Sequence, residues 1–148
     1  MAKEPRKYTP EERDQIAHVT YAENASEDND TIKMTAASIK NRLESGRTKE
    51  FGKDVSEVAK KGYAAVSKNS PLYREAVSGK FKDTASKAKW GEVRKLVDLV
   101  VDDPESSKAQ FYFKPEEETK LKAKKAFDFK QVKPTGRVGK YNTYAYGK

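Results

Sequence analysis

Three long stretches of the chain place their apolar residues on one face of an α-helix, and this pattern limits the fold more than any other feature. The first begins at Thr9-Pro10-Glu11-Glu12, an N-cap with a proline at the first helical position and a glutamate three residues after the cap. The second follows the polar residues 24–30, and the third ends before Pro104. The stripes consist of Ile16, Val19, Ala22 and Glu23; of Ile32, Ala36, Ile39 and Leu43; and of Trp90, Val93, Leu96, Val97 and Val100.

Shorter signals predict the rest of the chain. Residues 54–59 and 70–77 favour short helices, residues 110–113 a strand, and residues 115–125 a charged surface helix. The remaining segments indicate a hairpin of 127–133 and 140–146 with its turn at Pro134-Thr135-Gly136. A length of 148 residues suits one hydrophobic core. We therefore predict one α+β domain over residues 1–148, mainly α, with a small C-terminal β element and a flexible N-terminus at residues 1–8.

The composition of the chain excludes several kinds of catalytic and metal site and indicates the charge of its partner. The chain has no cysteine, so thiol catalysis and cysteine-ligated zinc are excluded, and its single histidine, His18, argues against a histidine-rich metal site. A net charge of +8 favours a polyanionic partner, which could be nucleic acid, an anionic membrane or the bacterial cell wall. No stretch reaches the roughly 20 apolar residues of a membrane helix, and the basic first ten residues precede no apolar segment of a signal peptide.

Glu23 is the carboxylate with the most unusual position. It follows Ile16 by seven residues and Val19 by four, so it shares the apolar face of its predicted helix. Burial disfavours the charged form of a carboxyl group and so favours the protonated form that a glycosidase needs in its general acid. The alternative is a glutamate at a helix end that is solvated or held in a salt bridge.

Other candidates have simpler explanations. Glu27 lies one turn after Glu23 and would point the same way, so it does not provide the opposed carboxylate of a paired glycosidase site and fits a solvated loop acid. His18 and Trp90 fit packing positions. The basic run 120–125 fits a solvated helix face, whereas the tyrosine-rich tail could stack on bases or sugars or simply cover a sheet.

Four segments, in order, resemble the SleB-type cell-wall hydrolases, named for the spore cortex-lytic enzyme. They are residues 16–27 (IAHVTYAENASE), 35–43 (TAASIKNRL), 109–115 (AQFYFKP) and, more loosely, 138–144 (VGKYNTY). The first matches the family segment that carries the catalytic glutamate, which falls on Glu23. Two departures are the absence of the family's loop glycine before Glu27 and of a histidine in the last segment, and residues 47–100 match poorly.

The resemblance implies a lysozyme-like, lytic transglycosylase-like fold and cleavage of the MurNAc–GlcNAc bond of peptidoglycan, with Glu23 as acid and then base. It implies no metal and no cofactor. Tyr112 is the candidate for stacking on the sugar and Asn41 for hydrogen bonding to it, while Glu27 is kept as a further candidate contact. We expect a monomeric lysin of bacteriophage type that acts in the periplasm and cell wall of its host, reached through a membrane lesion or from a virion.

Two other functions remain open at this point. The first is an endopeptidase of peptidoglycan crosslinks, which the single histidine and absent cysteine disfavour. The second is a basic nucleic-acid-binding module, whose affinity would fall steeply with salt. An inactive protein that binds the wall is also compatible with the missing glycine and histidine.

Overall fold

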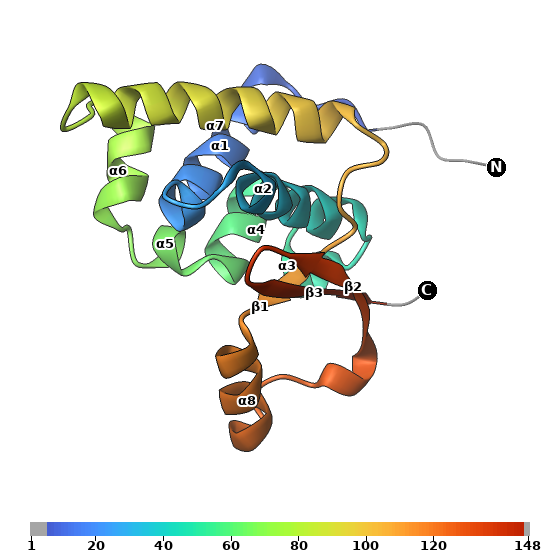
Figure 1. Cartoon of the computed structure of the whole chain (residues 1–148). Helices are drawn as coiled ribbons and strands as arrows, with labels where there is room; N and C mark the ends of the chain where they lie inside the picture. Colours follow the sequence, from blue (N-terminus) through green and yellow to red (C-terminus); the bar gives the residue numbers. More distant parts are fainter. Residues whose placement is uncertain (1–5, 147–148) are drawn as a thin grey trace.

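A computed structural model describes residues 6–146, which form eight α-helices and one three-stranded sheet (Figure 1). The prediction of an α+β chain that is mainly helical is confirmed. The helices are α1 Pro10–Asn24, α2 Asn29–Glu44, α3 Thr48–Phe51, α4 Val55–Gly62, α5 Ala64–Ser67, α6 Pro71–Ser78, α7 Thr84–Asp102 and α8 Pro115–Lys124. The strands are β1 Phe111–Phe113, β2 Val132–Val138 and β3 Tyr141–Tyr146, with a short 3-10 helix at Phe129–Gln131 before β2.

Side-chain caps explain where the long helices begin. At α1, the Thr9 hydroxyl accepts a hydrogen bond from the Glu12 amide (3.1 Å), and the Glu12 carboxylate accepts one from the Thr9 amide (3.0 Å). This reciprocal pair satisfies two amides that a helix start leaves free. Asp28 and Asp83 cap α2 and α7 in the same manner with one bond each. Helix α2 therefore starts at Asn29, one to two residues before the start near Asp30 or Thr31 that the apolar pattern predicts.

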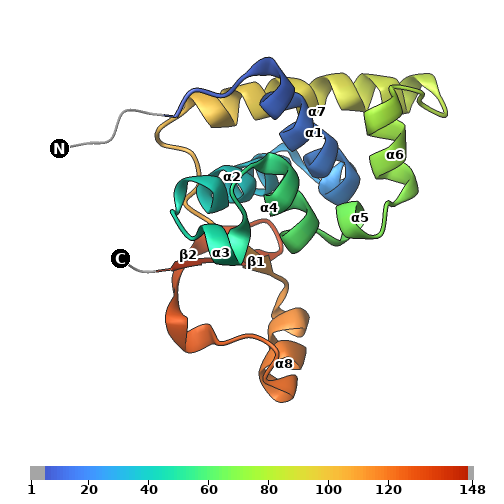
Figure 2. The same cartoon turned by 180° about the vertical axis from the view of Figure 1, so that it is seen from behind.

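The core lies where α1, α2 and α7 pack together, and α4, α5 and α6 close it from the other side (Figures 1 and 2). Its largest wholly buried side chains include Ile16, Val19, Ile32, Ile39 and Val97, which belong to the three predicted stripes. An ion-pair network ties α1 to α7 at the surface: Arg13 contacts Asp98 (2.8 Å) and Asp102 (2.6 Å).

Two short helices, α3 and α5, escape prediction because four residues are too few to show a helical period. Between α3 and α4, Gly52 has φ +116°, and a Cβ there would lie 2.7 Å from the Glu57 Cβ and 2.9 Å from the Glu57 carbonyl carbon. This close approach of two backbone segments requires glycine. Gly79 ends α6 in the left-handed conformation, as its place in the sequence predicts.

The sheet has the order β1-β3-β2, and both pairings are antiparallel. β2 and β3 form a hairpin, as predicted, but its turn is at Gly139-Lys140, so the prediction of a turn at Pro134-Thr135-Gly136 is wrong. The prediction of a first strand over residues 127–133 is wrong as well, because the strand runs from Val132 to Val138 and a 3-10 helix precedes it. Residues 134–136 form an irregularity inside β2 instead, where the register shifts between Pro134 and Gly136. An edge strand tolerates a proline without an amide proton, and a bulge tolerates Gly136 at φ +146°, so turn-type composition misleads here.

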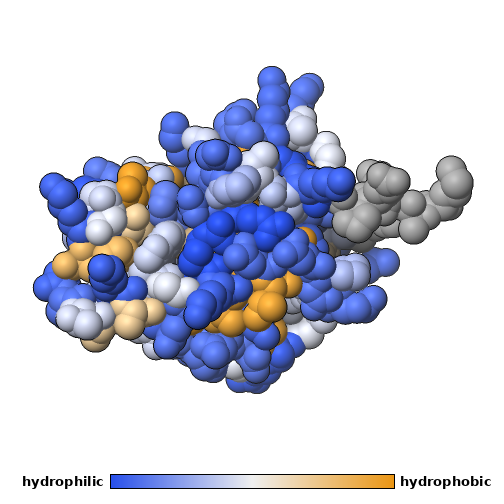
Figure 3. All heavy atoms as spheres, turned by 90° about the horizontal axis from the view of Figure 1, so that it is seen from above, coloured by the Kyte–Doolittle hydropathy of each residue, from blue (hydrophilic) through white to orange (hydrophobic). Residues whose placement is uncertain are grey.

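Helix α8 projects away from α1–α7, which we call the helical body, on the side of the sheet opposite α2 (Figures 1 and 2). It is held to the sheet by buried Glu118, whose carboxylate accepts hydrogen bonds from the side-chain amide of Asn142 (2.6 Å) and from the Tyr144 hydroxyl (2.5 Å). Seen along the vertical axis of Figure 1, the surface is mostly hydrophilic with a few small hydrophobic areas (Figure 3). Within residues 6–146, none of the helices combines the length and apolarity that a membrane crossing requires.

The expected flexible N-terminus falls partly on residues 1–5, which lie outside the described residues. Its last residue is ordered: Tyr8 is buried, and its hydroxyl donates a 2.5 Å hydrogen bond to Glu44 near the end of α2. Burial and this carboxylate raise the pKa of Tyr8 far above its usual range. The chain is therefore anchored to α2 before α1 begins.

Candidate active site

Glu23 lies in the last turn of α1 and is half-buried. Its Oε1 accepts a hydrogen bond of 3.1 Å from the backbone amide of Ala65 at the start of α5. The apolar stripe of α1 carries Ile16 and Val19 into the core, and Glu23 continues this stripe to its edge. The sequence thus places a fixed carboxylate at the boundary between core and solvent.

Three phenols lie near enough to this carboxylate for its charge to act on them. They are Tyr63, between α4 and α5; Tyr112, in β1; and Tyr141, in β3. Burial raises the pKa of Tyr63 and of Tyr141, and raises the pKa of Tyr112 well above its usual range. The negative charge of Glu23 adds to all three shifts. The phenols therefore stay protonated, and uncharged, at neutral pH.

Helix α2 supplies the floor of this cluster. The Ser38 hydroxyl lies 2.6 Å from the Tyr63 hydroxyl and donates to the Thr35 carbonyl oxygen (2.7 Å). The Thr35 hydroxyl accepts a 2.5 Å hydrogen bond from Asn24, the residue after Glu23. The Asn24–Thr35 bond thus fixes the end of α1 against α2, and the Ser38–Tyr63 bond fixes the segment between α4 and α5 against the same helix. Among the described residues, these buried side chains leave no polar atom unpaired.

Arg42, also on α2, is the functional candidate that sequence reasoning misses. Its guanidinium carbon lies 4.9 Å from the Tyr63 ring centre and at similar distances from Phe51 (5.2 Å) and Phe111 (5.0 Å). Its charge lowers the pKa of Tyr63 and Tyr112, against the effect of burial. A cation enclosed by aromatic rings is held by their quadrupoles, so Arg42 contributes a fixed positive charge beside the phenols.

Asn41 and Arg42 also hold the segment that leads into β1. The Asn41 side-chain amide donates to the carbonyl oxygens of Ser107 and Ala109, both at 2.8 Å, and Arg42 Nε donates to that of Gln110 at 2.7 Å. Both bonds come from the side-chain nitrogen of Asn41, and hydrogen bonding of this residue to a sugar stays a prediction. The observed contacts of Asn41 hold the segment before β1 and so help to position Tyr112 in that strand.

The ring of Tyr112 is half-buried and packs edge-on against Tyr141, with ring centres 5.2 Å apart. Its stacking on a sugar stays a prediction. Glu27 forms an ion pair of 2.8 Å with Lys140 at the turn between β2 and β3. It therefore fastens the hairpin to the loop after α1, and its role as a substrate contact also stays a prediction.

His18 packs where the simpler interpretation puts it. Its ring stacks on Trp90 of α7, with ring centres 5.3 Å apart and planes inclined by 21°. Burial lowers the pKa of His18, so the ring stays neutral in the fold at neutral pH. Tyr21 joins the same aromatic group through Trp90 and Phe81.

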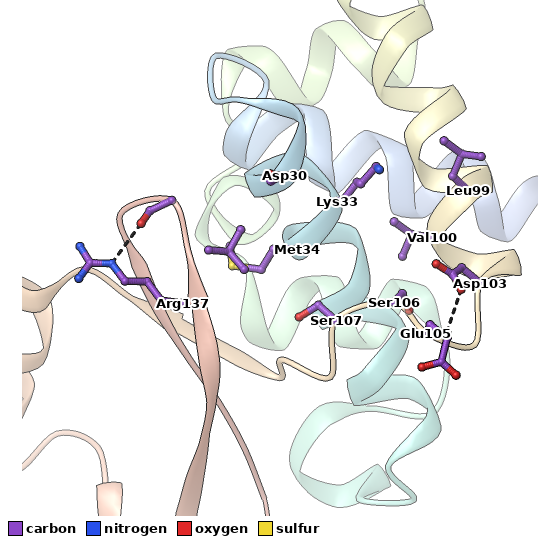
Figure 4. Close-up of a pocket in the computed structure, with 12 residues that line it drawn as sticks. Asp30, Lys33, Met34, Leu99, Val100, Asp103, Glu105, Ser106, Ser107 and Arg137 are labelled. Carbon is purple, nitrogen blue, oxygen red and sulfur yellow. Dashed lines mark hydrogen bonds between the residues drawn. The ribbon is translucent and has the colours of Figure 1, made fainter.

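A separate pocket of about 380 Å³ lies between α2, the end of α7 and the β2–β3 turn (Figure 4). Met34 and Val100 line it together with charges of both signs, among them Lys33, Arg137 and Glu105. None of the residues around Glu23 lines this pocket, so it is distinct from the candidate active site.

Among residues 6–146, no group of three or more His, Cys, Asp or Glu side chains is arranged to hold a metal ion. Comparison of the chain with family models, with curated proteins and with solved structures finds no match.

Proposed function

We propose that the chain is a peptidoglycan glycosidase that cleaves the MurNAc–GlcNAc bond as a lytic transglycosylase, with Glu23 as its general acid and base and with a lysozyme-like arrangement of its helices. The observation that carries the proposal is that the half-buried carboxylate of Glu23 is fixed at the edge of the core by the Ala65 amide, at 3.1 Å. Its charge also acts on the phenols of Tyr63, Tyr112 and Tyr141. The ordered motifs of the SleB-type hydrolases point to the same residue.

The chemistry needs a single carboxyl group. Protonated Glu23 gives its proton to the glycosidic oxygen as the C–O bond of the muramic acid breaks. The resulting carboxylate then takes the proton from a hydroxyl of the same muramic acid, whose oxygen attacks the anomeric carbon and closes an anhydro ring. The protonated phenols can donate hydrogen bonds to sugar oxygens, and Arg42 can compensate the charge of Glu23 between the two steps.

The hydrogen bond from the Ala65 amide to Glu23 allows a substitution to remove the acid and keep the local structure. In Glu23→Gln, the side chain keeps an oxygen that can accept the bond from Ala65, but it has no acidic proton to give. We expect Glu23→Gln to keep the fold and to lose roughly 100- to 10,000-fold of the activity on purified sacculi, the range for a lost general acid. Glu11→Gln, an exposed glutamate in the first turn of the same helix, is the matched control and is expected to retain activity.

Mass spectrometry of the digested wall identifies the reaction. Anhydro-muramyl ends support the transglycosylase, reducing sugar ends a hydrolase, and free amino groups from the peptides an endopeptidase. If Glu23→Gln digests sacculi as fast as the wild type, Glu23 serves only as an acceptor for the α5 amide and the proposal is wrong.

A further inference from the structure

The positive charge of the protein is concentrated at one end. Residues 120–133 carry six lysines and one aspartate, a net charge of +5 within a total of +8. All six lysines are exposed, and none forms a salt bridge within the part of the chain that the structure describes, residues 6–146. The single aspartate, Asp128, accepts hydrogen bonds from the Lys130 amide and the Gln131 side chain, both at 3.0 Å. We call this segment the basic tip; its lysines are Lys120, Lys122, Lys124, Lys125, Lys130 and Lys133.

The basic tip is also the part of the molecule that stands farthest from the helical body. Helix α8 and the chain that returns from it to β2 project beyond the sheet, and both views show them clear of α1–α7 (Figures 1 and 2). Buried Glu118 and its hydrogen bonds to β3 fasten this projection to the sheet, so the lysines of the basic tip are held in a fixed position.

Phenyl rings lie among these lysines. Phe127 and Phe129 are half-buried, with ring centres 4.9 Å apart, and they border a pocket of about 730 Å³. Lys122, Lys125, Lys130 and Asp128 also line this pocket. The Lys122 ammonium lies 5.1 Å from the Phe129 ring centre. Three cations, one carboxylate and two partly exposed aromatic rings therefore share one outward-facing surface, and its charged side chains leave a net positive charge.

We propose that the basic tip binds the surface of an anionic phospholipid membrane. Lysines near such a surface are attracted by its negative potential, and aromatic side chains between them fit the boundary between headgroups and acyl chains. The lysines contact headgroup phosphates around the pocket, and the edges of Phe127 and Phe129 enter the headgroup layer. This property does not depend on the proposed glycosidase activity, because it uses no residue near Glu23.

The same charge could attract single-stranded nucleic acid, but the rings are poorly arranged for that ligand. Stacking of bases requires open ring faces along a groove. Phe127 instead meets Phe111, Phe113 and Phe129 at interplanar angles of 62°, 59° and 76°, so its neighbours already occupy its surroundings. A projecting tip with packed rings suits a flat surface better than a strand.

The test is co-flotation of the purified protein with vesicles of equimolar phosphatidylglycerol and phosphatidylcholine, compared with vesicles of phosphatidylcholine alone. Each lysine near an anionic surface is worth roughly fivefold in partitioning. The triple variant Lys122→Gln, Lys125→Gln, Lys130→Gln is therefore expected to bind anionic vesicles about 100-fold more weakly. Binding of the wild type is expected to fall as salt is raised, because screening shortens the reach of the lysines.

The matched control removes the same charge elsewhere. Lys80, Lys82 and Lys87 are exposed near the junction of α6 and α7, away from α8 (Figure 1), and their replacement by glutamine is expected to reduce binding by less than threefold. Circular dichroism verifies that both variants fold, and Glu23→Gln should bind vesicles like the wild type. Equal losses in the two triple variants, equal binding to neutral vesicles, or a preference of the tip for a single-stranded oligonucleotide over anionic vesicles would each overturn the proposal.

Discussion

Replacing Asn41 with alanine separates the two roles that can be assigned to this residue. In the structure, its side-chain nitrogen donates at 2.8 Å to the carbonyl oxygens of Ser107 and Ala109, and Ala109 is fully buried. A hydrogen bond contributes about 1 kcal/mol net, and a buried acceptor left unpaired costs about 1–3 kcal/mol. Asn41→Ala is therefore expected to lower the free energy of unfolding by about 2 kcal/mol, which for a chain of this size corresponds to a fall in Tm of roughly 4–8 °C.

Urea unfolding followed by circular dichroism measures this change, and the midpoint should move while the m-value stays constant. Asn29→Ala, at an exposed position in the first turn of the same helix, is the control and is expected to change stability by less than about 0.5 kcal/mol. If Asn41→Ala unfolds at the wild-type urea concentration while the KM for glycan rises, Asn41 is a substrate contact after all. The assignment of this side chain to the positioning of β1 is then refuted.

Two further predictions concern stability. Gly52→Ala is expected to lower the free energy of unfolding in urea by more than about 2 kcal/mol, because the new Cβ would lie 2.7–2.9 Å from Glu57 and φ is +116°. Gly46→Ala, at φ +79° with open space around it, should lower it by only about 1 kcal/mol. Equal losses of stability in the two variants would contradict this reasoning. His18 has a lowered pKa in the fold because it is buried, so the unfolded chain takes up its proton first and stability falls as pH drops below about 6.5. Between pH 7.5 and 5, Tm should therefore fall less in His18→Gln than in the wild type; identical slopes would exclude His18 as a source of the pH dependence.

The helices could be predicted because their signals are local. Thr9, Asp28 and Asp83 act on amides within three residues, so their effect is visible in a short window of sequence. The hairpin turn could not be located in this way. Pro134 and Gly136 have the composition of a turn, but pairing with β3 places them in an edge strand, and that pairing is a tertiary effect.

The same difference between local and tertiary signals applies to the candidate site. Periodicity alone places Glu23 on the inner face of α1. Its neighbours Tyr63, Tyr112 and Tyr141 come from three other parts of the chain, and their separation of 40 or more residues from Glu23 hides them from any local pattern. Arg42 was hidden for a similar reason, because its aromatic enclosure combines α2 with α3, β1 and the end of α4.

The strand order β1-β3-β2 has a consequence for how the protein assembles. β1 and β2 do not pair with each other; each pairs only with β3, the last of the three in the sequence. The contacts among α1, α2 and α7 lie within residues 10–102, so the helical body can collapse before the sheet exists. Pairing of β3 with β1 brings Tyr141 beside Tyr112, whereas the segment before β1 is also held by Asn41 and Arg42 of α2. A chain in which the helical body has formed but β3 has not yet paired with β1 would therefore hold Glu23 in α1 without the contact between Tyr112 and Tyr141.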